Sequence, residues 1–259
     1  MLSIEDITFA VAVNSREVFE NNFLASPCLR ASHHPILVQR FDSAARAYND
    51  ALDKSVNDLM VFCHADIVLP QSWLLQLQRA LDHLQGRDPA WGVLGCAGVT
   101  QDGSFWGHVY SSGLGIFGKP FEAPERVQTL DEIVLILRKS SGLRFDESLP
   151  HFHLYGADIC LRAAKRGMKS YAISAFCIHN THQNLILPKE FYECCKHIKR
   201  VWKDCLPIQT TCIRITRFNL PIYKRRLREA YLRYIRRKEV GGTRVGNVQR
   251  LLEELAPML

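Results

Sequence analysis

The chain has 259 residues, of which 47% are hydrophobic and 23% are charged. This composition is ordinary for a folded protein and excludes a disordered or collagen-like chain, and the length suits one α/β domain with or without a helical appendage. No apolar run approaches the roughly 20 residues that a membrane-spanning helix needs. Because no basic region precedes the first apolar run, we expect no secretory signal and a cytoplasmic protein, free or peripheral to the inner membrane face.

The net charge of +7 is concentrated near the end of the chain. Residues 223–250 contain ten Lys or Arg and two Glu, a local charge of +8, so the remainder is close to neutral at −1. The basic character therefore belongs to the tail and says little about the main domain.

The nine cysteines include no Cys-x-x-Cys pair. Their odd number predicts reduced thiols and not a disulfide framework. A zinc site at Cys194, Cys195 and His197 is an alternative, although the spacing suits zinc poorly. Four other cysteines lie in apolar runs, where a free thiol behaves as a small hydrophobe: Cys63, Cys96, Cys160 and Cys177.

The first half of the chain alternates between short apolar runs and helical patterns. A buried strand is predicted over 7–13, ending at Asn14 and Ser15, with a helix start after Ser15. Further strands are predicted at 35–39, 59–63 and 91–98 and helices at 44–52 and 73–84, while the glycine-rich, aromatic stretch 101–118 indicates loops or a short hairpin.

The second half continues the alternation and then changes character. We predict a strand at 133–137, a helix at 157–166 stopped by Gly167, and strands at 170–173 and 176–178. Strands that alternate with helices predict an α/β layered fold. The boundary falls near 184–189, which divides the chain into a domain at 1–188 and a helical, basic extension at 189–259.

Three polar groups follow predicted strands directly. In open α/β sheets, ligands collect outside the carboxyl ends of the strands. We therefore expect a binding site to be built from Asn14-Ser15, His64-Ala65-Asp66 and His179-Asn180-Thr181-His182.

Two segments resemble the signatures of family 2 glycosyltransferases of the GT-A fold. Residues 59–74, LMVFCHADIVLPQSWL, resemble the family's Asp-x-Asp segment, with His64 in place of the first acid. The FDE turn at 145–147 and YGADICLR at 155–162, followed by Gly167, resemble the second signature. The likeness spans roughly residues 7–182 and is greatest to the subgroup of glycosyltransferase-like domains related to a streptomycin-biosynthesis protein.

The resemblance implies a GT-A-like (Rossmann-like) fold with a mixed, mainly parallel sheet flanked by helices. It implies transfer of a sugar from a nucleoside diphosphate sugar, such as a UDP-sugar, to an acceptor hydroxyl, with inversion and with Mn²⁺ or Mg²⁺. A cation held by oxygen ligands neutralises the diphosphate as the glycosidic bond breaks. The residues so implied are Asp66 and His179 for the metal, Asn14, Ser15, Asn49, His64 and Asp66 for the donor, and Asp158 as the base.

Each of these residues also has a structural interpretation. Asp66 by itself suits a turn or a helix cap, Asp158 suits the cap of the helix that follows it, and His179 suits a strand-end surface residue. His64 in place of an acid leaves open a domain that binds a nucleotide sugar without turning it over. His64 itself could contact the ribose, a phosphate or the metal.

The basic tail carries an apolar stripe at helical spacing. Such a helix could lie on anionic lipid, bind nucleic acid or hold an anionic acceptor, or its stripe could pack on the main domain. A nucleic-acid-binding protein is the third function considered, although we expect no nucleic acid as a partner. The acceptor is a glycan, a lipid-linked sugar or a small molecule. The stripe consists of Tyr223, Leu227, Tyr231, Tyr234 and Ile235.

Overall fold

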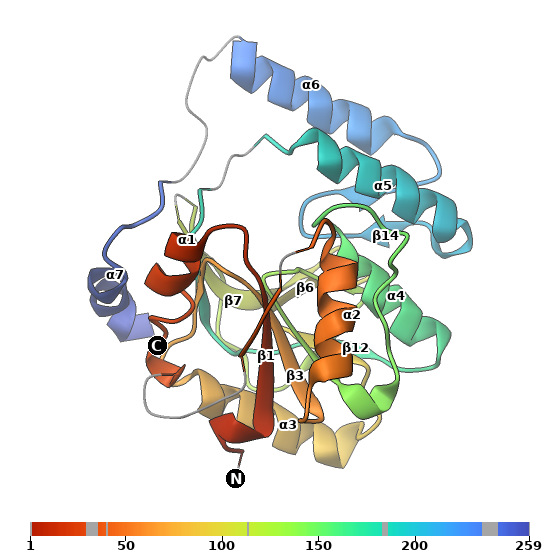
Figure 1. Ribbon diagram of the computed structural model, residues 1–259. Helices are drawn as coiled ribbons and strands as arrows, with labels where there is room; N and C mark the ends of the chain where they lie inside the picture. The colour runs from red at the N-terminus through yellow and green to blue at the C-terminus, as the bar shows by residue number, and fades with distance from the viewer. Residues whose placement is uncertain are drawn as a thin grey trace.

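The computed structural model describes residues 2–29, 36–39, 41–112, 114–182, 186–234 and 243–258. Its centre is a mixed sheet with helices on both faces (Figure 1). The seven strands run in the order β2 (Ile36–Gln39), β1 (Ile7–Ala12), β3 (Leu59–His64), β11 (Val134–Arg138), β5 (Val93–Gly95), β12 (Ser170–Ala172) and β9 (Glu125–Val127).

The mixed α/β fold is confirmed, but the seven-stranded sheet is not mainly parallel, because its parallel and antiparallel pairs are equal in number. The pairs β1–β2, β1–β3 and β5–β12 are parallel, and the pairs β3–β11, β11–β5 and β12–β9 are antiparallel. The antiparallel strand β11 therefore lies between two parallel blocks.

A second sheet continues from the first and carries part of the candidate site. Its order is β10 (Thr129–Leu130), β6 (Ala97–Val99), β7 (Phe105–Ser111), β13 (Cys177–His179) and β4 (Ile67–Val68), with β8 (Gly115–Gly118) paired to β7. The hairpin predicted within 101–118 is thus β7–β8. A separate two-stranded sheet joins β14 (Ile208–Gln209) to β15 (Arg214–Ile215).

Seven α-helices are described. Short 3-10 helices cover Ile4–Asp6, Pro27–Leu29, Lys139–Ser141, Lys203–Cys205 and Ala256–Met258. The α-helices are α1 (Arg16–Asn21), α2 (Ala44–Lys54), α3 (Trp73–Arg87), α4 (Tyr155–Lys165), α5 (Lys189–Val201), α6 (Leu220–Tyr234) and α7 (Val248–Leu255).

Alternation along the central strands builds two apolar layers. In β3, Met60 and Phe62 point to the layer covered by α2, α4 and α5, whereas Val61 and Cys63 point to the layer covered by α1 and α3. Successive side chains of a strand point to opposite faces, so a strand that is apolar throughout is buried on both sides.

The single strand predicted at 91–98 is wrong in one respect, because the chain bends at Cys96 and passes from the first sheet to the second as β5 and β6. Glycines allow the close packing at this bend. A Cβ on Gly95 would lie 3.0 Å from the carbonyl oxygen of Val134, and one on Gly98 would lie 2.8 Å from that of Thr129. The predicted strand 35–39 begins outside the described residues and is otherwise β2.

Residues after 188 contribute to the packing of the main body. Phe191 and Ile198 of α5 belong to the same apolar cluster as α4, and α7 packs through Leu251 and Leu252 against the β4–β13 region. Helix α6 lies beyond α5 at the upper edge of the molecule (Figure 1). Among the described residues, no helix is both long enough and apolar enough to cross a membrane.

Candidate metal and donor site

The pairing of β4 with β13 brings two of the predicted polar groups together. His179 lies opposite Ile67 in the antiparallel register, and the Asn180 backbone N–H donates to the Asp66 carbonyl oxygen at 2.9 Å. Parallel pairing of β13 with β7 fixes the other side of this strand. His64 is the last residue of β3 and precedes Asp66 by two positions. His64, Asp66 and His179 therefore converge where β3 and β13 end.

His64, Asp66 and His179 form one cluster. One ligand atom from each lies within 4.8 Å of the others, and this is the only group of three or more His, Cys, Asp or Glu found among the described residues that could hold a metal ion. Cys194, Cys195 and His197 therefore do not form a zinc site of this kind.

The Asp66 carboxylate is held between two basic groups. His179 Nε2 lies 3.3 Å from Asp66 Oδ1, and Arg244 Nη2 lies 3.4 Å from Oδ2. Burial raises the pKa of Asp66, but the hydrogen bond and charge of His179 and the nearby His64 outweigh it and hold the pKa well below its ordinary range. Asp66 is therefore an anionic oxygen donor at neutral pH.

His64 is neutral and has a fixed orientation. Burial lowers its pKa to about 4, against the opposing charge of Asp66. The Tyr155 hydroxyl donates to the carbonyl oxygen of Glu132 at 3.2 Å and lies 2.9 Å from His64 Nε2. With its proton directed to Glu132, the hydroxyl can accept from His64 Nε2–H, and in that tautomer Nδ1 keeps a free lone pair.

Arg244 reaches the cluster from the C-terminal segment. Its Nε donates to the Asn180 carbonyl oxygen at 2.9 Å. The fully buried Asn180 side chain is bonded to both backbone polar groups of Val245, with its amide donating to the carbonyl and its Oδ1 accepting from the N–H, and it also donates to Asn22. These bonds fix the segment that precedes α7 against the site.

The structure places Asp158 in the interior and not at the cluster. Its side chain is 1% exposed, and its two carboxylate oxygens accept from Arg162 Nε at 2.6 Å and Trp202 Nε1 at 2.7 Å. Burial raises its pKa, against the charge of Arg162 and the bond from Trp202. These contacts join α4 to the end of α5. An acceptor hydroxyl could reach the carboxylate only after Arg162 or Trp202 moved.

The structure also shows no contact with the cluster for three predicted donor-binding residues among those described: Asn14, Ser15 and Asn49. The buried Asn49 amide donates to the Phe145 carbonyl oxygen at 3.0 Å and to Glu147 Oε1 at 2.9 Å, and it accepts from the Phe145 N–H. Ser15 caps α1 by accepting from the Val18 N–H, and Asn14 is exposed at the end of β1. Their contacts with a donor stay predictions.

Three site residues were missed by sequence reasoning. Tyr155 was quoted only as part of a signature, and Glu132 and Arg244 were not singled out at all. Glu132 lies beside the first turn of α4, where the backbone N–H groups of Leu154 and Gly156 stabilise its anion, yet burial is the larger effect and raises its pKa to about 8. Such a pKa suits proton exchange near neutral pH.

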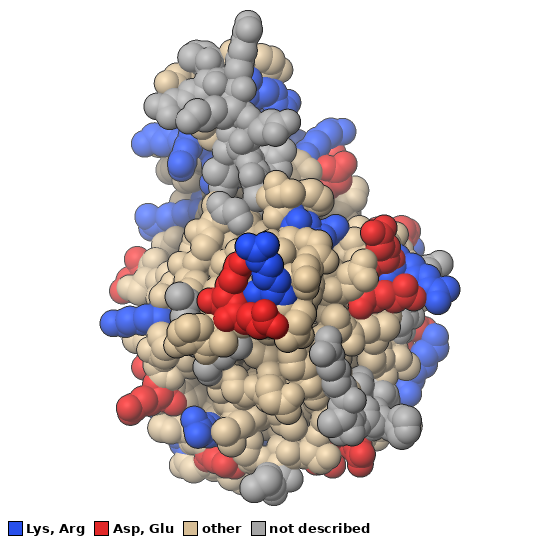
Figure 2. All heavy atoms as spheres, turned by 90° about the vertical axis from the view of Figure 1, so that its left-hand side faces the viewer, with Lys and Arg blue, Asp and Glu red and all other residues tan. Residues whose placement is uncertain are grey.

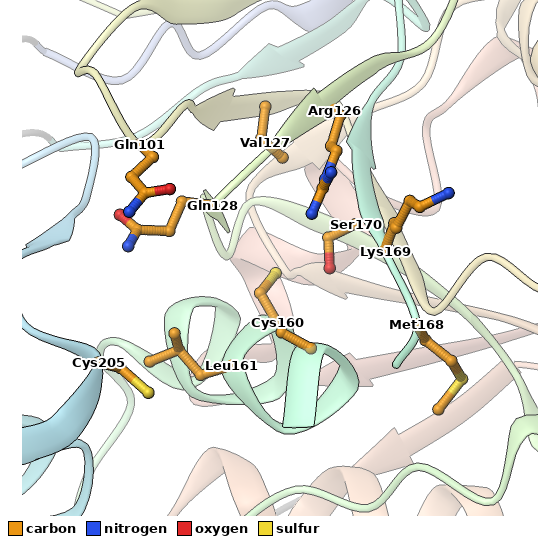
Figure 3. A pocket seen from close by; sticks show the side chains of 11 residues that line it. Gln101, Arg126, Val127, Gln128, Cys160, Leu161, Met168, Lys169, Ser170 and Cys205 are labelled. Atoms are coloured by element: carbon orange, nitrogen blue, oxygen red, sulfur yellow. The ribbon is translucent and has the colours of Figure 1, made fainter. Parts of the chain in front are cut away.

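A pocket of about 500 Å³ lies elsewhere, between α4 and the β9–β12 edge (Figure 3). Arg126, Lys169 and Cys160 are among its lining residues, and none of the seven predicted site residues lines it. This pocket is therefore separate from the three-residue cluster.

Comparison with known proteins matches most of the chain to one family model. Residues 9–198 match the model of a family described as glycosyltransferase like family. A protein from Fuscovulum blasticum, named ATP synthase subunits region ORF 6, is 32% identical over 130 residues, which are 47% of this chain and 50% of that protein. The chain thus matches about half the length of this relative.

Two similar solved structures share little sequence with the chain. The mannosyltransferase PcManGT from Pyrobaculum calidifontis, in complex with GDP-Man and Mn²⁺, is 12% identical with a TM-score of 0.49 and covers 97% of this chain and 75% of that one. TarS from S. aureus, in complex with UDP-GlcNAc, is 13% identical with a TM-score of 0.47. The match covers 75% of this chain and 65% of that one. At these values the two likenesses carry no argument about activity.

Proposed function

Because the chain belongs to the glycosyltransferase-like family, we propose that it transfers a sugar from a nucleoside diphosphate sugar to an acceptor hydroxyl, with a divalent cation held by His64, Asp66 and His179. The observation that carries this proposal is the cluster itself: two imidazoles and one carboxylate meet where β3 and β13 end. Ligands of open α/β sheets bind at such strand ends.

The donor set fits a transition-metal cation better than Mg²⁺. Mg²⁺ prefers oxygen ligands and near-ideal octahedral geometry, whereas imidazole suits softer divalent ions. Asp66 supplies an anionic oxygen, and the low pKa of His64 keeps its imidazole neutral and able to ligate. We therefore place Mn²⁺ first. When bound, the cation would supply Lewis-acid neutralisation of the donor diphosphate.

Two neighbouring side chains prepare the site for an anionic donor. Tyr155 orients the His64 ring through Nε2, as outer-shell partners of ligating histidines do. Arg244 places a guanidinium beside Asp66, where it would bind a phosphate oxygen of the donor. Both residues act on binding and orientation, and neither needs to exchange a proton.

We propose that a carboxylate near the first turn of α4 takes the acceptor's proton during an inverting displacement. Asp158 is the candidate from the family resemblance, and Glu132 is the candidate from its position beside Tyr155 and its raised pKa. The pair Asp158→Asn and Glu132→Gln separates them, because the base is the residue whose loss abolishes turnover while donor binding persists.

We also propose a cytoplasmic location and a UDP-sugar as the first donor to test. The cysteines support the location, because all nine are free and seven are buried, as in proteins kept in a reducing compartment. Candidate acceptors are glycans, lipid-linked sugars and small molecules with a free hydroxyl.

The test is a panel of UDP- and GDP-sugars with Mn²⁺, scored by release of the nucleoside diphosphate with and without EDTA. We expect release with at least one donor, its loss with EDTA and its loss in Asp66→Asn. Asp82→Asn, an exposed aspartate on α3, is the matched control and should behave as the wild type. Donor binding without release, in the presence of varied acceptors, would instead indicate a binding module.

A further inference from the structure

Helix α6 turns an apolar face toward solvent. Five residues at intervals of three, four, four and three lie on one side of it, and Leu227 and Tyr234 are each 71% exposed. Helix α6 itself lies beyond α5, at the outer edge of the molecule in Figure 1. We call this face the outward stripe: Leu220, Tyr223, Leu227, Tyr231 and Tyr234.

The opposite face of α6 is anchored, so the direction of the outward stripe is fixed. Glu229 is buried and accepts from the Tyr192 hydroxyl at 2.7 Å, from Arg225 Nε at 2.9 Å and from the Leu187 N–H at 3.2 Å. Ile222, on the same side as Glu229, packs against the main apolar cluster. Tyr223, Leu227, Tyr231 and Tyr234 of the predicted stripe are therefore not packed on the domain, and its last member, Ile235, lies outside the described residues.

Basic side chains flank the outward stripe on both sides. At 3.6 residues per turn, Lys224 and Arg228 lie on one flank and Arg226 and Arg233 on the other. The Arg226 guanidinium lies over the Tyr192 ring of α5, 5.6 Å from its centroid. In Figure 2, Lys and Arg stand on both sides of the projecting upper end of the molecule. The only acid in α6 is Glu229, which is turned inward.

We propose that the outward stripe of α6 docks on an anionic lipid bilayer. An apolar and aromatic strip bordered by Lys and Arg is the surface of a helix that lies in the membrane interface. The strip enters the headgroup boundary while the long basic side chains reach the lipid phosphates. The hydroxyls of the tyrosines stay within reach of the polar headgroups.

Charge favours this occupant over two others. A second copy seated on the same strip would bring the two sets of flanking cations together, which costs free energy. A nucleic acid would attract the flanks but would leave Leu220 and Leu227 facing phosphates at the centre of the contact. Of these three occupants, the anionic bilayer is the one that complements both the apolar centre and the cationic border.

The experiment is co-sedimentation of the full chain with vesicles of phosphatidylcholine alone or with about one third phosphatidylserine. We expect stronger binding to the mixed vesicles, weakened by salt. The variant Tyr223→Ser/Leu227→Ser/Tyr231→Ser should lower the partition coefficient about tenfold or more, because it removes most of the buried apolar area. Leu75→Ser, at an exposed leucine of α3, is the matched control and should bind as the wild type.

A second variant tests the flanks without touching the stripe. Replacing Lys224, Arg226, Arg228 and Arg233 by Gln should abolish the preference for phosphatidylserine. Circular dichroism checks that each variant is folded. Nucleotide binding, which depends on the distant cluster, is a second check. The membrane proposal does not depend on glycosyl transfer.

Three results would overturn the proposal. One is a wild-type chain that does not sediment with the mixed vesicles, and another is a stripe variant that binds them as the wild type does. The third is a stripe variant that keeps vesicle binding but loses another association that the wild type shows. That association would be dimerisation, measured by sedimentation velocity, or binding to a labelled oligonucleotide.

Discussion

Replacing Tyr155 by Phe removes one hydroxyl and leaves the buried ring. The hydroxyl lies 2.9 Å from His64 Nε2 and 3.2 Å from the Glu132 carbonyl oxygen, within hydrogen-bond distance of both. The ring contacts with Tyr48 and Phe145, at centroid distances of 5.4 and 6.1 Å, do not involve it. The change therefore acts on the orientation and tautomer of His64.

Two magnitudes follow from those bonds. Loss of two neutral hydrogen bonds lowers the free energy of unfolding by about 1–3 kcal/mol, which a domain of this size tolerates. Loss of an outer-shell partner of a ligating histidine lowers metal affinity by about 10–100-fold, equivalent to about 1.4–2.8 kcal/mol. We therefore expect a folded Tyr155→Phe variant that binds Mn²⁺ at least about tenfold more weakly.

Titration of free Mn²⁺ by electron paramagnetic resonance measures this affinity directly. Tyr171→Phe is the matched control, because the Tyr171 ring is also buried and its hydroxyl donates to Asp88 Oδ2 at 2.8 Å, away from the cluster. Wild-type Mn²⁺ affinity in Tyr155→Phe, with a melting temperature lowered as in the control, would refute the positioning role of Tyr155.

Three further predictions concern charged groups around the site. Arg244→Gln should raise the Kd for UDP in the presence of Mn²⁺ by about tenfold, since a charge-assisted bond to phosphate is lost. Arg250→Gln, at an exposed arginine of α7, should leave the Kd unchanged, and equal Kd values for the two variants would exclude the phosphate contact. Asp158→Asn should lower the free energy of unfolding by about 2–4 kcal/mol, because two buried bonds to the carboxylate are disturbed, and an unchanged melting temperature with lost turnover would instead make it the base. Burial raises the pKa of Glu132 from 4.5 to about 8 in the folded chain, so its contribution to stability is complete below about pH 4.5 and is lost progressively as pH rises to about 8. The melting temperature of Glu132→Gln should therefore fall less than that of the wild type between about pH 5 and 8, and parallel profiles would contradict this.

The parts of the site that are local in sequence could be predicted from the sequence. His64 and Asp66 follow the apolar run that became β3, and His179 follows the run that became β13. Each signal is an apolar strand with a polar end, which needs no knowledge of tertiary contacts. The two ends belong to different sheets, and they meet because β4, which follows Asp66, pairs with β13.

Contacts between distant segments could not be predicted in this way. Arg244 meets Asp66 across 178 positions of the chain and lies in a basic stretch whose other members are indistinguishable from it by pattern. Asp158 was found as part of a motif, but its bond to Trp202 depends on how α5 packs. Helical spacing revealed the stripe of α6, but the side that faces the body is shown by tertiary contacts of Glu229 and Ile222.

The central claim is that His64, Asp66 and His179 hold a cation on which donor binding depends. Isothermal titration of UDP and GDP into the wild-type chain, with Mn²⁺ or with EDTA, tests it most directly, together with the Asp66→Asn variant. We predict tight binding of at least one nucleotide only with Mn²⁺, and the same weak binding in Asp66→Asn under both conditions. A nucleotide affinity that is equal with Mn²⁺ and with EDTA in the wild type would contradict the account.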